Sequence, residues 1–317
     1  MHLVYLGVVK RLISFWKHGL GDKRKILSST QLGSINDELS DLRGELPCEL
    51  ARQLPTLDTS ETWKATELRS FLLYVGPIVM KSYLNPSYYQ SFLSLSIGIS
   101  ILCQENEESR ISLLEYARQL LTYFVDNCAT LYSPQFVSYN VHSILHISDD
   151  VESLQSSLNR ISAFPFESYL NFLKGLVHGS NRPTQQAVNR LLELKNIGHQ
   201  RPTTLSKTKV SNNFKDGCFF VNDNEVLFVT QTSSDPVTGT LVNFTKFENV
   251  FGRHFPSKSF KIGFVRRELI DTASKVRLCP FQYICKAVCL PHKRGFAVVP
   301  LHHFDGSTEA KNISCST

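Results

Sequence analysis

The chain has 317 residues, enough for about two domains, and 42% of them are apolar, as in ordinary folded globular proteins. It holds no run of about 18 apolar residues, and its first residues lack both the basic region and the cleavage site of a signal peptide, so we expect no membrane partner and no secretion. The net charge of +6 is uneven: residues 201–317 hold 16 Lys and Arg against 9 Asp and Glu, whereas residues 1–200 hold 18 against 19. A basic half indicates either a polyanion partner or a solubilising surface.

Residues 1–200 have the apolar spacing of helices. An almost wholly apolar helix is predicted from Leu3 to Trp16, followed by a long loop with short helical turns over 19–60 and a helix from Trp63 to Val75. Asn85-Pro86 is typical of a helix start, and further helices are predicted near 108–128, 139–155, 166–178 and 183–195.

The pattern changes after residue 197. Residues 198–215 are polar and predict a linker, and short strand-like runs follow, of which the first two flank a turn at 222–224. We therefore predict an α+β fold: a mostly helical region at 1–197, a linker at 198–215, a small all-β barrel at 216–305 and a disordered tail at 306–317.

Several segments, in the same order, resemble the animal branch of CACTA-type DNA transposases and the uncharacterised domain that follows their catalytic core. The segments are 1–12, 63–77, 136–151, 162–170 and 285–301. The resemblance implies that the helical region is the carboxyl-terminal part of an RNase H-like core. It also implies DNA cleavage by Asp, Asp and Glu residues that hold two Mg²⁺ or Mn²⁺ ions. The eight scattered cysteines, with no secretory signal, separately indicate a nuclear or cytoplasmic location.

The resemblance assigns few catalytic residues to this chain. The family's Asp-x-Met-His motif corresponds to Met1-His2 here, so His2 is its remnant, and we expect the motif's Asp to be encoded upstream. Glu167 corresponds to the third acid, and Lys174 fits the basic residue that follows it. Because one carboxylate cannot hold two metal ions, we expect no bound metal and no cleavage by this chain alone. From the sequence alone Glu167 is better explained as an ordinary acid in a helix's first turn, and the resemblance makes the two interpretations equal.

Basic residues in the predicted barrel suggest a second function. Phosphate contacts would come, with Lys174, from Arg266, Arg267, Lys275, Arg277, Lys293 and Arg294. The alternative to a transposase fragment is thus a domesticated module that binds nucleic acid or protein without enzymatic activity. DNA and protein partners both stay open, and no small-molecule substrate is indicated.

Two further groups resemble metal sites only weakly. His142 and His146 are four residues apart, but no third ligand is evident, and we expect a pair packed in the helical core. The spacing of Cys279, Cys285 and Cys289 matches no zinc motif, and Cys285 and Cys289 are expected to face the same side of a strand.

Overall fold

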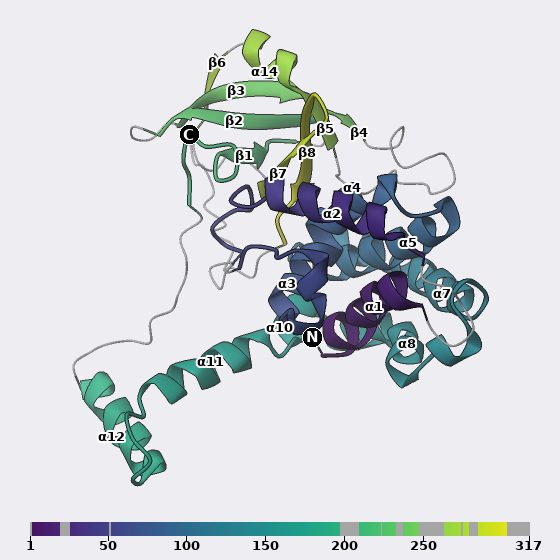
Figure 1. The fold of residues 1–317 in the computed structure, drawn as a ribbon. Helices are drawn as coiled ribbons and strands as arrows, with labels where there is room; N and C mark the ends of the chain where they lie inside the picture. The colour runs from purple at the N-terminus through teal and green to yellow at the C-terminus, as the bar shows by residue number, and fades with distance from the viewer. Residues whose placement is uncertain are drawn as a thin grey trace.

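A computed structural model describes residues 2–19, 26–50, 52–196, 209–222, 224–232, 237–246, 263–273, 275–278 and 285–302. Figure 1 shows a helical region, residues 2–196, beneath an antiparallel sheet region, residues 218–300. This arrangement confirms the α+β class and the order of helices before strands. The predicted boundary at 197, most of the linker and the tail lie outside the described residues, so those limits stay predictions.

The helical region begins with a π-helical segment and continues through short and long helices. Its elements are η1 (His2–Val9), α1 (Lys10–His18), α2 (Ser29–Asp41), η2 (Leu57–Thr62), α3 (Ala65–Ser70), η3 (Phe71–Val75), α4 (Gly76–Val79), η4 (Met80–Ser82), α5 (Pro86–Leu102), α6 (Glu107–Ser112), α7 (Leu114–Leu131), η5 (Pro134–Phe136), α8 (Tyr139–His142), η6 (Ser143–His146), α9 (Ile147–Ser153), α10 (Leu158–Ile161), α11 (Phe164–Gly175) and α12 (Pro183–Asn196).

The predicted start of α5 is confirmed, because the Asn85 side chain accepts a hydrogen bond from the Ser87 N–H at 3.2 Å and Pro86 occupies the first turn. The predicted loop over 19–60 is wrong for α2. There Ser28 and Gln31 form a capping box that satisfies two backbone N–H groups at the helix start.

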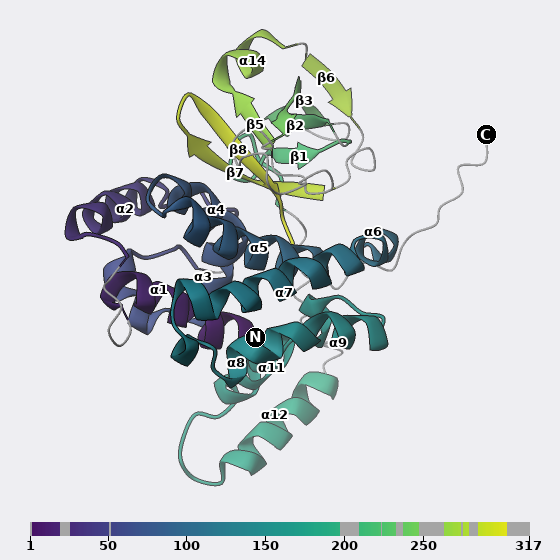
Figure 2. The same ribbon diagram turned by 90° about the vertical axis from the view of Figure 1, so that its right-hand side faces the viewer.

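Helices α5 and α7 pack against each other in the centre of the helical region (Figure 2). Gly98 permits this approach, because a Cβ atom there would lie 2.7 Å from Cδ2 of Leu121. Large side chains such as Trp16, Phe92 and Phe124 fill the surrounding core and have no exposed surface.

The sheet is an eight-stranded antiparallel sheet in the order β4-β5-β8-β7-β1-β2-β3-β6 among the described residues. Its strands are β1 (Cys218–Phe220), β2 (Glu225–Gln231), β3 (Val237–Asn243), β4 (Thr245–Lys246), β5 (Gly263–Arg266), β6 (Lys275–Leu278), β7 (Cys285–His292) and β8 (Gly295–Pro300). Strands β1 and β2 form the predicted hairpin.

The sheet curls into a half-barrel, because β3 and β4 follow each other directly in the chain but lie near opposite edges of the sheet. Strand β3 pairs with β2, and after Phe244 the chain continues as β4, which pairs with β5. The expectation of an all-β unit is wrong in one respect: the helix α14 (Arg267–Thr272) follows β5 and packs against β3, β5 and β8.

The sheet region packs directly on the helices through β7 and β8. Both faces of this hairpin are buried, and one of them lies against the helical region. One face of the hairpin, with Val288, Leu290 and Val299, belongs to the core of the helical region. The other face, with Cys289 and Val298, lies in a separate core inside the curl. Successive side chains along β7 and β8 point to opposite faces, so each strand contributes residues to both cores.

Buried polar contacts join the same two regions. The Lys286 ammonium lies 2.8 Å from both carboxylate oxygens of Glu49 and 2.9 Å from Oδ1 of Asp216. Their side chains are at most 3% exposed. At the end of β8, the His302 N–H donates to the Tyr74 hydroxyl at 3.0 Å, and Arg69 donates to the His302 carbonyl oxygen.

Candidate functional site

The two residues assigned by resemblance to a catalytic centre lie next to each other. Nε2 of His2, on η1, is 4.0 Å from Oε1 of Glu167, on the first turn of α11. Packing fixes this approach, because the rings of Tyr5 and Phe164 are 5.9 Å apart and hold η1 against the start of α11. The side chains of His2 and Glu167 are 69% and 48% exposed, so the ion pair itself contributes little stability.

Glu167 borders a hollow of about 500 Å³, which also reaches Lys10, Lys64 and Glu61. The hollow therefore contains a second carboxylate, which we did not expect from the sequence. Glu61 is engaged elsewhere, since Lys17 Nζ lies 2.9 Å and His18 Nε2 3.3 Å from its Oε1. The hydrogen bond from Lys17 lowers the pKa of Glu61 to about 2, so it is an ionised carboxylate at neutral pH.

These groups do not fit a centre for two metal ions. Among the described residues, the one set of three or more acidic, His or Cys ligand atoms within 4.8 Å of one another is Cys48, Glu49 and Asp216. The Lys286 ammonium already lies between the two carboxylates of that set. Glu167 belongs to no such set, and a Mg²⁺ ion needs more oxygen ligands than it can supply.

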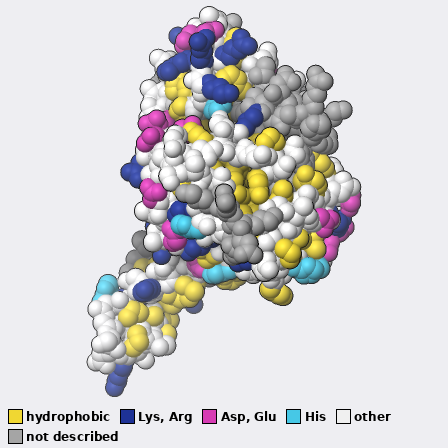
Figure 3. All heavy atoms as spheres, turned by 45° about the vertical axis from the view of Figure 1, so that its right-hand side comes forward, with side chains coloured by type: hydrophobic (Ala, Val, Ile, Leu, Met, Phe, Trp, Pro, Cys, Tyr) yellow, Lys and Arg dark blue, Asp and Glu magenta, His cyan; other side chains and the backbone are white. Residues whose placement is uncertain are grey.

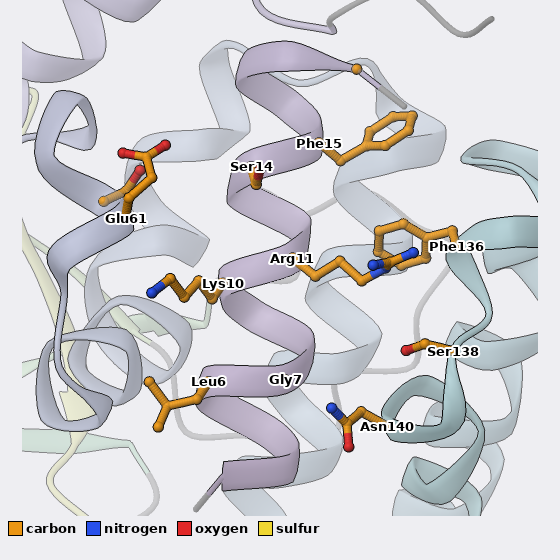
Figure 4. Close-up of a pocket in the computed structure, with 12 residues that line it drawn as sticks. Leu6, Gly7, Lys10, Arg11, Ser14, Phe15, Glu61, Phe136, Ser138 and Asn140 are labelled. Carbon is orange, nitrogen blue, oxygen red and sulfur yellow. The ribbon is translucent and has the colours of Figure 1, made fainter. Parts of the chain in front are cut away.

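A second hollow of about 440 Å³ lies along the same helices and shares Leu6, Lys10 and Glu61 with the first. Figure 4 shows Lys10 extending from one side of the η1–α1 helix toward Glu61, and Arg11 from the other side toward Phe136. Three hydrogen-bonding side chains complete its lining: Ser14 on α1, Ser138 just before α8 and Asn140 on α8.

The predicted phosphate-binding residues divide into several places. Arg266 lies opposite Gly295, and the Arg267 N–H donates to the Arg294 carbonyl oxygen at 3.2 Å. With Lys293 in the β7–β8 turn, four exposed basic residues thus gather at one end of the sheet. Figure 3 shows Lys and Arg side chains collected at the sheet end of the molecule.

The remaining predicted contacts lie elsewhere. Lys174 is exposed on α11, and Lys275 is exposed on β6 at the sheet edge. Arg277 lies on β6, but its side chain is outside the described residues. The structure therefore groups Arg266, Arg267, Lys293 and Arg294 and separates Lys174 from them.

The expected pair of core histidines is wrong. His142 and His146 have ring centroids 5.5 Å apart, but both residues are exposed, because they lie on the outer side of α8 and η6. No third ligand joins them within the described part of the chain.

The prediction that Cys285 and Cys289 share a side of β7 is confirmed, since both contact the core inside the curl. Cys218 on β1 lies in the same core, and Cys279 is outside the described residues. Burial, with the neighbouring Cys289 next, raises the pKa of the Cys218 thiol. A thiol rather than a thiolate makes a poor metal ligand.

Comparison with known proteins gives no match: this chain matches no family model, no curated protein and no solved structure. Among the described helices, none is both long and apolar enough to cross a membrane.

Sequence reasoning missed two groups of charged residues. Glu61 lies far from Glu167 in sequence, and Lys286, Glu49 and Asp216 come from three separate segments. Nothing in the local sequence marks these pairs. The one available signal is a lysine in an otherwise apolar strand, Cys285–Leu290, because a buried ammonium requires acceptors.

Proposed function

We propose that this chain derives from a metal-dependent DNA transposase and contributes Glu167, but no complete metal centre, to DNA processing. The observation that supports this proposal best is the 4.0 Å approach of His2 to Glu167. The resemblance selects these two residues from opposite ends of the helical region on their sequence motifs alone.

The surface of α11 is a second support. Phe166, Tyr169 and Leu170 are 69%, 40% and 62% exposed, and α11 and α12 extend away from the other helices in both ribbon views (Figures 1 and 2). A helix with apolar residues exposed along it is rarely stable alone in water. In the proposed RNase H-like core, a central sheet would cover this face.

Under this proposal the chain's own side chains cannot hold the two metal ions that DNA cleavage requires. Hydrolysis or strand transfer at a phosphodiester would need two metal ions, held by converging carboxylates. Glu167 would supply one ligand, and Glu61 already contacts Lys17 and His18. The further acids would come from segments that the resemblance places before residue 1.

An extended polypeptide tests the transposase origin. Under the proposal, the gene's reading frame upstream of Met1 encodes an Asp two positions before it and further acids. A protein that includes this segment should nick supercoiled plasmid with Mn²⁺, and Glu167→Gln should abolish nicking, whereas the control Glu193→Gln on α12 should not. An upstream frame without these acids, or nicking that Glu167→Gln leaves unchanged, would refute the origin.

We propose nucleic-acid binding by the sheet region as a second candidate function, because four exposed basic residues gather at one end of the sheet, where Glu268 on α14 is the neighbouring acid in the sequence. Within the described residues, Arg266, Arg267, Lys293 and Arg294 form no ion pair with a carboxylate. An excess of positive charge on one part of the surface favours a polyanion partner.

Duplex DNA binding by the full chain at several salt concentrations tests this candidate. Changing all four residues to Gln should weaken binding at least tenfold and flatten the salt dependence, because each phosphate contact contributes about 0.9 to the slope. The control Lys195→Gln, at the end of α12, should change neither. No duplex binding at low salt would exclude this version and leave protein recognition.

A further inference from the structure

Helices α11 and α12 form an arm, residues 164–196, that packs on little of its own chain. Beyond Phe164, none of its side chains belongs to a hydrophobic core or packs against one among the described residues. Within the same part of the chain, α12 has no buried residue. The arm projects from the other helices in both ribbon views (Figures 1 and 2). Isolated helices of 12 and 14 residues are marginal in water, so this arm needs a partner surface.

The corner between the two helices is nevertheless fixed. Nε2 of Gln186 donates to the Asn181 carbonyl oxygen at 2.6 Å and to the Gly179 carbonyl oxygen at 3.3 Å, and its Oε1 accepts from the His178 N–H at 3.0 Å. Arg182 adopts a left-handed backbone with φ of 49°, which reverses the chain before α12. These contacts hold α12 at a set angle to α11, although no core supports it.

Helix α12 has one apolar side and one polar side. Val188 and Leu192 lie one turn apart on the same side of the helix and are 45% and 53% exposed. On the opposite side, Arg190 Nη1 lies 2.7 Å from Oε2 of Glu193. The charges of the polar side thus pair within the helix, whereas the apolar side is open to solvent.

The arm exposes enough apolar surface for a specific contact. Phe166, Tyr169 and Leu170 extend it along α11, and Figure 3 shows hydrophobic side chains exposed on the arm. Five large side chains, each about half exposed, leave roughly 500 Å² of apolar surface, which is near the upper end of what a monomer exposes. Two such surfaces together bury on the order of 1,000 Å², the lower limit for a specific protein interface.

A second copy of this chain fits this surface by symmetry. The midpoint between Val188 and Leu192 is residue 190, which is also the middle of α12. An antiparallel two-fold contact therefore overlaps the two helices along their whole length, with their dipoles opposed. It places Val188 opposite Leu192 of the partner subunit and keeps the paired charges on the outside.

We propose that this chain forms a symmetric dimer through the arm, with α12 antiparallel to α12 of the partner subunit. The central sheet expected in an extended polypeptide would cover part of α11. The resemblance, however, stops at residue 170 in this region and assigns no cover to α12. The dimer goes beyond the proposed function, since it needs neither Glu167 nor the basic end of the sheet.

Sedimentation velocity of the 317-residue chain tests the proposal. The unaltered chain should pass from monomer to dimer between about 1 and 100 µM, the range expected for an interface of this size. Leu192→Glu should weaken the dimer at least about tenfold, because each dimer would bury two unpaired carboxylates. A chain that stays monomeric over this range, or an equally strong dimer of Leu192→Glu, overturns the proposal.

A matched control separates the arm from surface hydrophobicity in general. Leu154, at the end of α9, is 59% exposed and lies outside the arm, so Leu154→Glu should leave the association unchanged. Equal weakening by Leu154→Glu and Leu192→Glu would contradict an arm-specific contact. Because α12 has no buried residue, Leu192→Glu should keep the circular dichroism spectrum of the dilute unaltered chain.

Disulfide cross-linking tests the orientation of the two helices. Val188→Cys chains mixed with Leu192→Cys chains in oxidised glutathione should form a covalent dimer of the two variants, because the antiparallel contact brings these positions together. Arg190→Cys, on the opposite side of α12, should cross-link no more than the unaltered chain with its native cysteines. Cross-linking of Arg190→Cys as efficient as that of the mixture would overturn the antiparallel dimer.

Discussion

Nζ of Lys286 lies 2.8 Å from Oε2 of Glu49, and both side chains are 3% exposed. The contact joins a strand of the sheet region to the loop after α2, and Asp216 adds a second carboxylate at 2.9 Å. Lys286 also donates to the Lys209 carbonyl oxygen at 2.8 Å, so its ammonium is fully hydrogen-bonded. The sheet region and the helical region are thus joined by a buried charge cluster as well as by β7 and β8.

Removal of the Lys286 charge should destabilise the fold strongly. Lys286→Met leaves Glu49 and Asp216 buried without a cation, which typically costs about 3–5 kcal/mol. Chemical unfolding monitored by circular dichroism measures this cost. The matched control Lys275→Met, at an exposed position on β6, should change stability by less than about 0.5 kcal/mol. Equal stability of the two variants would mean that the cluster does not hold the regions together.

Acid should weaken the same cluster. Burial opposes ionisation of Asp216, but hydrogen bonds from Lys286 and from the Cys48 N–H outweigh it, so the pKa of Asp216 is lowered. A carboxyl with a lowered folded-state pKa adds stability above its unfolded pKa of about 3.9, and this stability is lost as pH falls further. Asp216→Asn should therefore flatten the decline in unfolding free energy below about pH 4. An unchanged decline would contradict the assignment.

His302 should make the protein sensitive to a milder acid range. Burial, followed by the charge of Arg69, lowers the pKa of His302 to about 3, and Nε2 has no hydrogen-bond partner among the described residues. The folded state therefore favours the neutral ring, and its contribution is complete above about pH 6.5 and is lost as pH falls toward 3. At pH 5 the loss should be ~2 kcal/mol.

Urea unfolding of His302→Leu at pH 7 and pH 5 measures this effect. The variant should lose less stability between the two values than the unaltered protein. His178→Leu, whose ring is exposed on the segment between α11 and α12, is the matched control and should behave as the unaltered protein. If His302→Leu retains the full pH dependence, another group titrates in this range.

Helix packing at Gly98 gives a prediction for the core. Gly98→Ala places a methyl group 2.7 Å from Leu121 Cδ2, so α5 and α7 must separate or Leu121 must move. Overpacking of this kind costs about 1–3 kcal/mol, despite the better helix propensity of Ala. Thermal unfolding checks it, and Gly33→Ala on α2, where no atom lies within 4 Å, should be neutral or stabilising.

Local signals in the sequence predicted most elements but not their assembly. Asn85-Pro86 marked the start of α5, and short strand-like runs marked β7 and β8, because caps and strand-forming composition are local properties. Helix α2 was not predicted, although Ser28 and Gln31 have the spacing of a capping box, because Gly33 and several polar residues weaken its apolar pattern. Helix α14, only six residues long, is too short for periodicity to detect.

The candidate site was predictable only in part, because it depends on distant contacts. The resemblance identified His2 and Glu167, but not Glu61 beside them or the hollow along Lys10 and Arg11. Strand register alone brings Arg266 and Arg267 to Lys293 and Arg294. The spacing of these residues in the sequence does not predict how the strands pair.

Incubation of the purified 317-residue chain with supercoiled plasmid in Mg²⁺ or Mn²⁺ tests the central claim most directly. Because Glu167 has no converging carboxylates within the described residues, plasmid should stay supercoiled to the same extent as with the Glu167→Gln variant. Metal-dependent nicking that Glu167→Gln abolishes would contradict the account, since it would mean that this chain alone assembles a working centre.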